Sequence, residues 1–273
     1  MFEIRSAATL TAQELAHAFT RGFEGYAVPV RFGTREWSEF VRVMSVDIDT
    51  SVVALEGEVP VGILAIGIRG DEARIAGMGV VPERRHQGLG RQMLAHGLTT
   101  TNARSPTRVV LEVIDQNAAA RELYRSFGFR EARRLVGWDR PATPTHCAES
   151  TCVVPIRELA RAAFRLEGSR LPWPVAPESL GMMAPPMQAR ALGDDSAHAL
   201  VRLPEEGPAR LTTVVATCVD RATTLLRALC AESPPRAWTC PPNLPEGYLS
   251  DAFDAAGFVP GAVTQYEMVL ECA

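Results

Sequence analysis

The sequence predicts an α/β protein in which helices cover a mixed β-sheet. Apolar segments with strand-like alternation recur between segments that have the 3.6-residue period of helices. Two adjacent hairpin strands, at residues 51–55 and 59–68, precede a β-α-β-α-β order. Hairpin strands run antiparallel and strands joined through a helix run parallel, so a sheet that holds both kinds is mixed.

The elements of the first half follow from local signals. Thr11 and Glu14 form a capping box that opens a helix reaching about Phe23. Thr34 is expected to cap a second helix with one apolar face. A Glu-Gly-Glu turn at 56–58 joins the hairpin strands. The other expected elements are strands at 2–6, 73–81, 109–114 and 129–138, and helices at 88–103 and 118–127.

The second half repeats the later part of this order. The expected strands are at 197–203, 211–216, 236–240 and 264–271, and the expected helices are at 219–232 and 247–256. The segment from Tyr124 to Phe129 (YRSFGF) resembles the segment from Phe253 to Phe258 (FDAAGF). One structural unit used twice explains both the order and this similarity.

Composition divides the chain after Arg140. Residues 1–140 hold 18 Arg, 17 acidic residues, four Pro and no Cys, whereas residues 141–273 hold 10 Arg, 15 acidic residues, 16 Pro and all six Cys. We therefore expect a first domain at 1–140, a linker or strand connection at 141–155 and a second domain at 156–273. A prior of about one domain per 150 residues also gives two domains.

Charge and residue usage exclude several classes of protein. The net charge of −4 argues against nucleic acid and anionic membranes as partners. All 28 cationic residues are Arg, so enzymes that need a particular lysine are excluded: Schiff-base and pyridoxal-phosphate enzymes, Walker-A NTPases and protein kinases. No secretory leader, membrane helix or paired C-x-x-C is expected, and free thiols favour a cytoplasmic protein. The histidines show no metal-binding spacing.

The strongest local signal is the segment from Gly79 to Gly90, GVVPERRHQGLG. A strand ends at Pro82, and a turn with two glycines then opens a helix, whose first N–H groups are free to bind an anion. Arg84 and Arg85 add positive charge. This pattern predicts a pyrophosphate site, although the glycines alone are also explained by a tight turn or by close helix packing. A dinucleotide loop would need a third glycine where Met93 stands, and a P-loop would need Lys.

The second signal runs from Leu111 to Phe129, LEVIDQNAAARELYRSFGF. Glu112 on a central strand is a candidate general base, and Tyr124 on the next helix is a candidate general acid. A solvated strand end explains Glu112 equally well, and a core aromatic ring with its hydroxyl at the edge explains Tyr124. Asn117 is either a ligand contact, a helix N-cap or both.

Together, the two segments resemble the signature of the GCN5-related N-acetyltransferase (GNAT) superfamily over residues 2–138. The acetyl-CoA loop of that family, Q/R-x-x-G-x-G/A, is matched by residues 85–90 at every specified position. Its downstream block, L-E-V-x-x-x-N-x-x-A-x-x-L-Y-x-x-x-G-F, is matched by residues 111–129. The resemblance implies the GNAT fold, in which the fourth and fifth strands splay apart around the pantetheine arm of acetyl-CoA.

The resemblance also implies roles for individual residues. Asn117 would contact acetyl-CoA, Tyr124 would lie near its sulfur, and Glu112 would be the base, as in the ribosomal-protein acetyltransferases of the superfamily. The residues implied to bind the cosubstrate through their backbone are Met78, Gly79 and Val80 along the pantetheine arm, and Arg85, His86, Gln87, Gly88, Leu89 and Gly90 at the pyrophosphate.

The expected activity is acetyl transfer from acetyl-CoA to a primary amine of a small molecule or peptide. The amine attacks directly, and no covalent enzyme intermediate is needed, which agrees with a first half that has no Cys. The alternative is a CoA-binding sensor or regulatory protein without activity. Glu112 and Tyr124 favour the enzyme, because a binding protein needs neither.

The second half departs from the family pattern. The helix expected from Val219 has no preceding glycine pair, and Phe253 stands where the first half has Tyr124. We expect a degenerate GNAT-like domain that has lost acetyl-CoA binding and serves packing, the acceptor pocket or a homodimer. The first half shows one strand after Gly128 where the family uses two, so the other is expected from residues 149–156 or from the second half.

Overall fold

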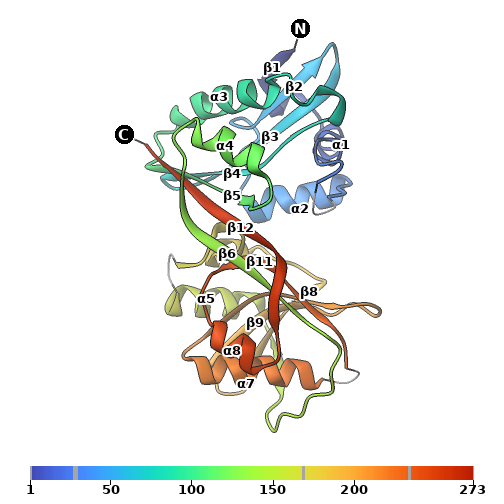
Figure 1. Cartoon of the computed structure of the whole chain (residues 1–273), viewed down its shortest axis with the longest axis vertical. Helices are drawn as coiled ribbons and strands as arrows, with labels where there is room; N and C mark the ends of the chain where they lie inside the picture. Colours follow the sequence, from blue (N-terminus) through green and yellow to red (C-terminus); the bar gives the residue numbers. More distant parts are fainter. Residues whose placement is uncertain (1, 27–29, 168–169, 233–234, 273) are drawn as a thin grey trace. The chain divides into compact units, whose positions relative to one another are not determined.

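The structure, a computed structural model, describes residues 2–26, 30–167, 170–232 and 235–272 (Figure 1). It separates into two compact units, each built from more than one stretch of chain. The first unit comprises Met1–Glu112, Ala118–Arg130 and Met268–Ala273, and the second comprises Val113–Asn117 and Glu131–Glu267. The α/β fold class with a mixed sheet is confirmed. The expected functional domains, 1–140 and 156–273, stay predictions.

The first unit contains most of the elements expected for the first half. Its strands are β1 (Glu3–Ser6), β2 (Val52–Glu56), β3 (Val59–Arg69), β4 (Glu72–Val80) and β5 (Arg108–Ile114), which begins here. Its helices are α1 (Ala12–Gly22), α2 (Thr34–Met44), α3 (Leu89–Asn102) and α4 (Ala118–Arg125). The order β1-β2-β3-β4 is antiparallel throughout, whereas β4 and β5 are parallel.

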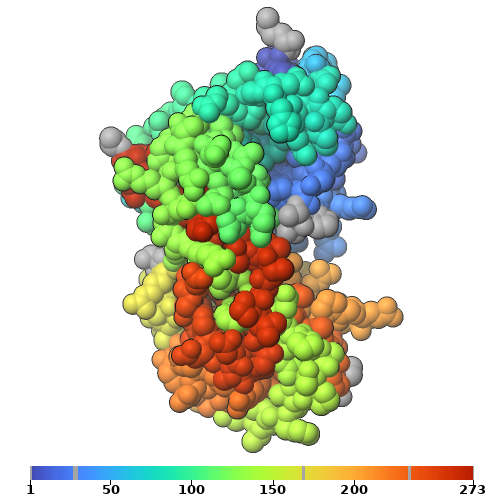
Figure 2. All heavy atoms as spheres, in the orientation of Figure 1, coloured from blue at the N-terminus to red at the C-terminus, as the bar shows by residue number. Residues whose placement is uncertain are grey.

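Helices cover both faces of this sheet. Ile63 of β3 packs in one buried cluster with Phe19 of α1 and Trp37 of α2. Val61, two residues earlier, packs instead with Met93 of α3, because Val61 is the extra residue at the bulge that breaks the β2–β3 register. The Nη2 of Arg91 in α3 donates to Oγ of Ser126, the residue directly after α4 (2.9 Å). The segments that contain α3 and α4, teal and green in Figure 2, form adjacent parts of the surface of this unit.

The two predicted helix starts differ in detail. At α1 the capping box is present, because Thr11 N–H donates to a Glu14 carboxylate oxygen (2.7 Å) and Glu14 N–H donates to Thr11 Oγ1 (3.3 Å). At α2 the cap is Gly33 rather than Thr34, which is the first helical residue. The carboxylate of Glu36 accepts the Gly33 N–H (3.0 Å), so a side chain from inside the helix does the capping.

The second unit adds three elements that the sequence did not suggest: α5 (Ile156–Leu166), α6 (Pro177–Gly181) and β8 (Met187–Leu192). It also contains β7 (Thr151–Val154), which lies in the segment 149–156 where a strand was one of the expectations. The expected elements are β6 (Arg130–Arg140), β9 (Ala197–Arg202), β10 (Ala209–Ala216), α7 (Val219–Ala231), β11 (Trp238–Pro245), α8 (Ser250–Ala255) and β12 (Val259–Glu271). Their strand order is β12-β6-β11-β10-β9-β8-β7. No helix among the described residues is long and apolar enough to span a bilayer.

The internal repeat is visible in the backbone. Gly128 and Gly257 both adopt positive φ, +93° and +81°. Each lies within a turn in which the N–H of Phe129 or Phe258 donates to the carbonyl of Tyr124 or Phe253. The two aromatic pairs are both edge-to-face, with ring centroids 5.8 and 5.4 Å apart. The same local structure therefore ends α4 and α8.

Part of the last strand of each half belongs to the unit of the other half. Residues 268–273, at the end of β12, belong to the first unit, where Cys272 N–H donates to Thr107 O (2.9 Å). Residues 131–140 of β6 belong to the second unit, where β6 pairs with β11. The strand that the first half lacks therefore comes from the second half of the chain, and the segment 149–156 supplies β7 to the second unit instead.

Candidate active site

The candidate site begins where β4 and β5 part. Their parallel ladder ends at Ile75 and Leu111. Ala76 is an extra residue against β3, because Ile75 is opposite Ile66 and Gly77 is opposite Ala65. A bulge of this kind bends a strand and ends its pairing on one side. Residues 77–80 stay paired with β3, so their other backbone edge is available to an extended, amide-containing ligand.

Glycines allow α1 to approach this part of β4. A Cβ built on Gly79 would lie 2.8 Å from the carbonyl carbon of Gly22, and a Cβ on Gly77 would lie 2.7 Å from the ring of Phe19. Side chains at 77 and 79 are thus excluded on the α1 face. The predicted backbone role of Met78, Gly79 and Val80 stays a prediction, and this geometry is compatible with it.

Replacing Gly79 with Ala is expected to destabilise the fold. The new methyl group would contact backbone atoms of Gly22, which cannot rotate away, so the free energy of unfolding should fall by roughly 1–3 kcal/mol. Gly193→Ala is the matched control, because a Cβ there meets no described atom within 4 Å. Urea denaturation compares the two. Equal midpoints for both variants would show that α1 and β4 are not held in this close approach.

The turn after β4 exposes backbone N–H groups. A 3₁₀ helix spans Pro82–Arg84, His86 and Gly88 take positive φ (+60° and +78°), and α3 begins at Leu89. The N–H groups of the first helical turn have no partner within the helix. A Cβ at Gly88 would meet no described atom within 4 Å, so the turn faces open space. Alternating backbone conformations of this kind form concave anion sites.

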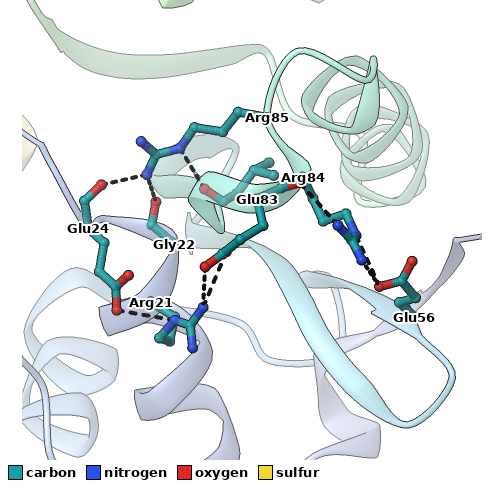
Figure 3. Close-up of polar contacts among 8 residues, drawn as sticks. Arg21, Gly22, Glu24, Glu56, Glu83, Arg84 and Arg85 are labelled. Atoms are coloured by element: carbon teal, nitrogen blue, oxygen red, sulfur yellow. Dashed lines mark hydrogen bonds and ion pairs between the residues drawn. The ribbon is translucent and has the colours of Figure 1, made fainter.

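The arginine side chains of the turn are engaged elsewhere (Figure 3). The Arg85 Nε donates to Val80 O (2.9 Å), and its Nη2 donates to the carbonyls of Gly22 (3.2 Å) and Glu24 (2.6 Å). Arg84 donates through Nε and Nη2 to one carboxylate oxygen of Glu56 (3.0 and 2.7 Å). In the structure Arg85 therefore fixes the end of α1 against the turn, and an anion there would be bound mainly by backbone amides. Gln87 donates its side-chain amide to Glu83 O (3.2 Å).

Glu112 is the first residue of β5 beyond the paired segment, and its carboxylate is buried. Arg74 of β4 donates to Oε2 through Nε (2.8 Å) and Nη2 (2.5 Å). The other oxygen, Oε1, is also buried and has no hydrogen-bond partner among the described residues. Glu112 is thus not a solvated strand end. Arg74 was missed by the sequence analysis, because no local spacing connects two residues 38 positions apart.

Tyr124 is buried at 6% exposure and packs edge-to-face on Phe129. Burial, with a smaller contribution from Tyr26, raises the pKa of the Tyr124 phenol well above its usual value. The hydroxyl therefore keeps its proton throughout the neutral range, as a general acid must. Tyr26 is a second phenol of the first unit that the sequence analysis did not select; its ring lies 5.3 Å from that of Phe23.

Asn117 directly precedes α4, and its N–H donates to Ile114 O (2.9 Å). It belongs to the segment Val113–Asn117 of the second unit, whereas the other predicted site residues belong to the first. Its contact with a cosubstrate stays a prediction.

The corresponding region of the second unit has the same bulge in its strand, but it lacks the turn with positive φ angles that could bind an anion. Thr212 is the extra residue of β10, in the place that Ala76 has in β4. Tyr248 donates its hydroxyl to the carbonyl of Val214 (2.9 Å), which corresponds to Met78, so this backbone edge is occupied by the protein itself. The turn before α7 contains no residue with positive φ, and Cys218 is extended (φ −161°).

Residues 12–129 match the model of the acetyltransferase (GNAT) family. The [ribosomal protein bS18]-alanine N-acetyltransferase of Escherichia coli strain K12 is 44% identical over 62 residues. That stretch is 23% of this chain and 42% of the relative, so the chain spans less than half of the curated relative that it matches.

Two solved structures are similar over almost the whole chain. A GCN5-related N-acetyltransferase from Sphaerobacter thermophilus has a TM-score of 0.69 at 15% identity, covering 99% of this chain and 95% of that one. A tandem GNAT protein from the clavulanic acid biosynthesis pathway has a TM-score of 0.65 at 18% identity, covering 99% and 98%. At these identities the likeness shows the fold, which is the tandem GNAT fold.

Proposed function

Because residues 12–129 match the model of the acetyltransferase (GNAT) family, we propose that the chain is an acetyl-CoA-dependent N-acetyltransferase. It moves the acetyl group to a primary amine by direct attack. The observation that carries the proposal is the backbone edge of β4 that β5 no longer pairs, at residues 77–80, where Arg85 Nε donates to the carbonyl of Val80. This edge leads into the positive-φ turn at the start of α3. The pantetheine arm of acetyl-CoA would pair with the strand edge, and its pyrophosphate would lie at the turn.

The residues fit acetyl-CoA chemically. Residues 78–80 offer backbone donors and acceptors to the pantetheine amides, apart from the Val80 carbonyl, which accepts from Arg85 Nε. The amides of residues 86–90 offer donors to the pyrophosphate, whereas the Arg85 N–H donates to Pro82 O (3.3 Å). Gly88 leaves room for that group, since a Cβ there would meet no described atom within 4 Å. When bound, acetyl-CoA supplies an activated thioester.

The two candidate catalytic residues suit the proton transfers. An amine must lose its proton before its lone pair can attack, and Oε1 of Glu112 can accept that proton directly or through water, since no described residue donates to it. The departing thiolate gains a proton from the Tyr124 hydroxyl, which the raised pKa keeps protonated. No step needs a covalent bond to the protein.

An acceptor screen tests the proposal. Candidate amines are mixed with acetyl-CoA, and release of the CoA thiol is followed; the panel contains small amines, amino acids, aminoglycosides and peptides. It includes a peptide that begins with alanine, because the E. coli relative is named for acetylating an alanine of a ribosomal protein. A melting-temperature screen with acyl-CoAs runs in parallel. Binding of acetyl-CoA without transfer to any amine would favour the sensor alternative.

One molecule of acetyl-CoA is expected to bind per chain. In the second unit Tyr248 occupies the backbone edge of β10, and the turn before α7 lacks positive-φ residues. Calorimetric titration should therefore give a stoichiometry of one, and Tyr248→Ala should leave it unchanged because the turn is still missing. Two sites in the wild-type chain would contradict the degenerate character that we assign to the second half.

A further inference from the structure

The buried ion pair of Arg74 and Glu112 has an unusual geometry. The two side chains are 8% and 5% exposed. Arg74 directs both Nε and Nη2 to the same oxygen, Oε2, instead of bridging the two carboxylate oxygens. Oε1 is left buried without a donor from any described residue.

Stability does not explain this arrangement. Removing two charges from water is costly, and the cost is recovered only where the remaining lone pairs are also satisfied. Here the lone pairs of Oε1 are not satisfied by the protein.

We propose that Arg74 is a positioning residue for the base of the transfer reaction, an inference that rests on the proposed function. By holding Oε2 with two donors, Arg74 fixes the carboxylate plane and leaves Oε1 as the one oxygen that can take a proton. The guanidinium is itself held on the α2 side, where Nη1 contacts the sulfur of Met44 (3.5 Å). The base therefore cannot rotate away from the point where β4 and β5 part.

Arg74→Ala with chemical rescue tests this role. Loss of the guanidinium should lower kcat about 10²-fold, the size of effect expected from misplacing a catalytic group by about 1 Å, while KM for acetyl-CoA stays within about twofold. Added guanidinium ion, below denaturing concentrations, should enter the vacated space and restore kcat at least about tenfold. Arg74→Lys, which keeps one donor and the charge, should retain intermediate activity.

Three control variants test whether the rescue by guanidinium is specific to the pair of Arg74 and Glu112. Arg69→Ala removes a guanidinium that donates to Ser45 Oγ and Val43 O (both 3.0 Å), so kcat should stay near wild type with no response to guanidinium. Glu112→Gln and the double variant Arg74→Ala/Glu112→Gln should not be rescued. Full activity of Arg74→Ala, or a loss that guanidinium does not restore, would overturn the positioning role and leave a merely structural one.

A melting experiment on the same variants does not depend on turnover. Arg74→Ala leaves a buried carboxylate unpaired, so the double variant with Glu112→Gln should melt at a higher temperature than Arg74→Ala alone. If the double variant melts at a lower temperature than Arg74→Ala, the two side chains are not coupled and the proposal fails.

If the wild type transfers acetyl to no amine, the proposed function fails, and the positioning role fails with it, even where the two side chains are coupled. Arg74→Gln replaces Arg74→Ala if the latter does not fold.

Discussion

Tyr124→Phe is expected to lower acetyl transfer by 10²–10⁴-fold, the range typical of a lost general acid. The change removes only the hydroxyl, so the edge-to-face contact with Phe129 and the buried volume are kept. Because burial raises the pKa of this phenol, the wild-type hydroxyl is protonated across the whole working pH range. The fall should therefore appear in kcat at every pH, with little change in the affinity for acetyl-CoA.

Tyr248→Phe is the matched control, since it removes the hydrogen-bonded hydroxyl of a half-buried tyrosine in the second unit and should leave turnover unchanged. Glu112→Gln should also lower turnover, but its effect should shrink as pH rises and more of the amine loses its proton unaided. If both residues act in one step, the two losses should not multiply. Should Tyr124→Phe and Glu112→Gln both turn over like wild type, the acid and base are assigned wrongly, and catalysis rests on positioning the amine.

Gly88→Glu is expected to abolish most of the stabilisation by acetyl-CoA. The new carboxylate would stand in the open space of the turn, where we expect the pyrophosphate, and such like-charge contact costs several kcal/mol, an affinity loss of about 10²-fold or more. At a concentration of 100 times the wild-type Kd, acetyl-CoA adds about 2.7 kcal/mol to the stability of the wild type. At the same concentration it should add only about 0.4 kcal/mol to the variant.

Gly70→Glu separates this effect from backbone strain. Gly70 also has positive φ (+54°), and a Cβ there also meets no described atom within 4 Å, but it lies in the β3–β4 turn. Both variants should lose stability without ligand, since a non-glycine residue at positive φ costs roughly 1–2 kcal/mol. Only Gly88→Glu should lose the melting shift with acetyl-CoA. An unchanged shift in Gly88→Glu would refute the assignment of the turn to the pyrophosphate.

Local signals predicted local structure well. The capping box of α1 and the two glycine-terminated turns after α4 and α8 formed where the sequence placed them, because each depends on residues within a few positions. The fold class followed from the order of strands and helices. The helix α5 was not predicted, although it is amphipathic; it begins directly after the segment 141–155 that was interpreted as a linker or strand connection.

Long-range features had no local signal. Nothing near β12 indicates that its last residues lie in the first unit. The partner of Glu112 could not be read from spacing, and the charge expected from Arg85 is directed to backbone carbonyls of α1 and its following loop. For the candidate site, the sequence predicted which segments take part. The hydrogen-bond partners of each side chain could be identified only in the structure.

The division of the last strands between the two units has a consequence for biosynthesis. The ribosome completes residue 130, where the first unit is interrupted, long before residue 268, where that unit resumes. At about 5–20 residues per second, the 138 residues from 131 to 268 take roughly 7–28 s. During this time the nascent first unit lacks its last strand and has an open sheet edge, the kind of edge that pairs with other chains. A fragment that stops at residue 140 would keep that edge open permanently, so expression of the first unit on its own demands that residues 268–272 be supplied with it.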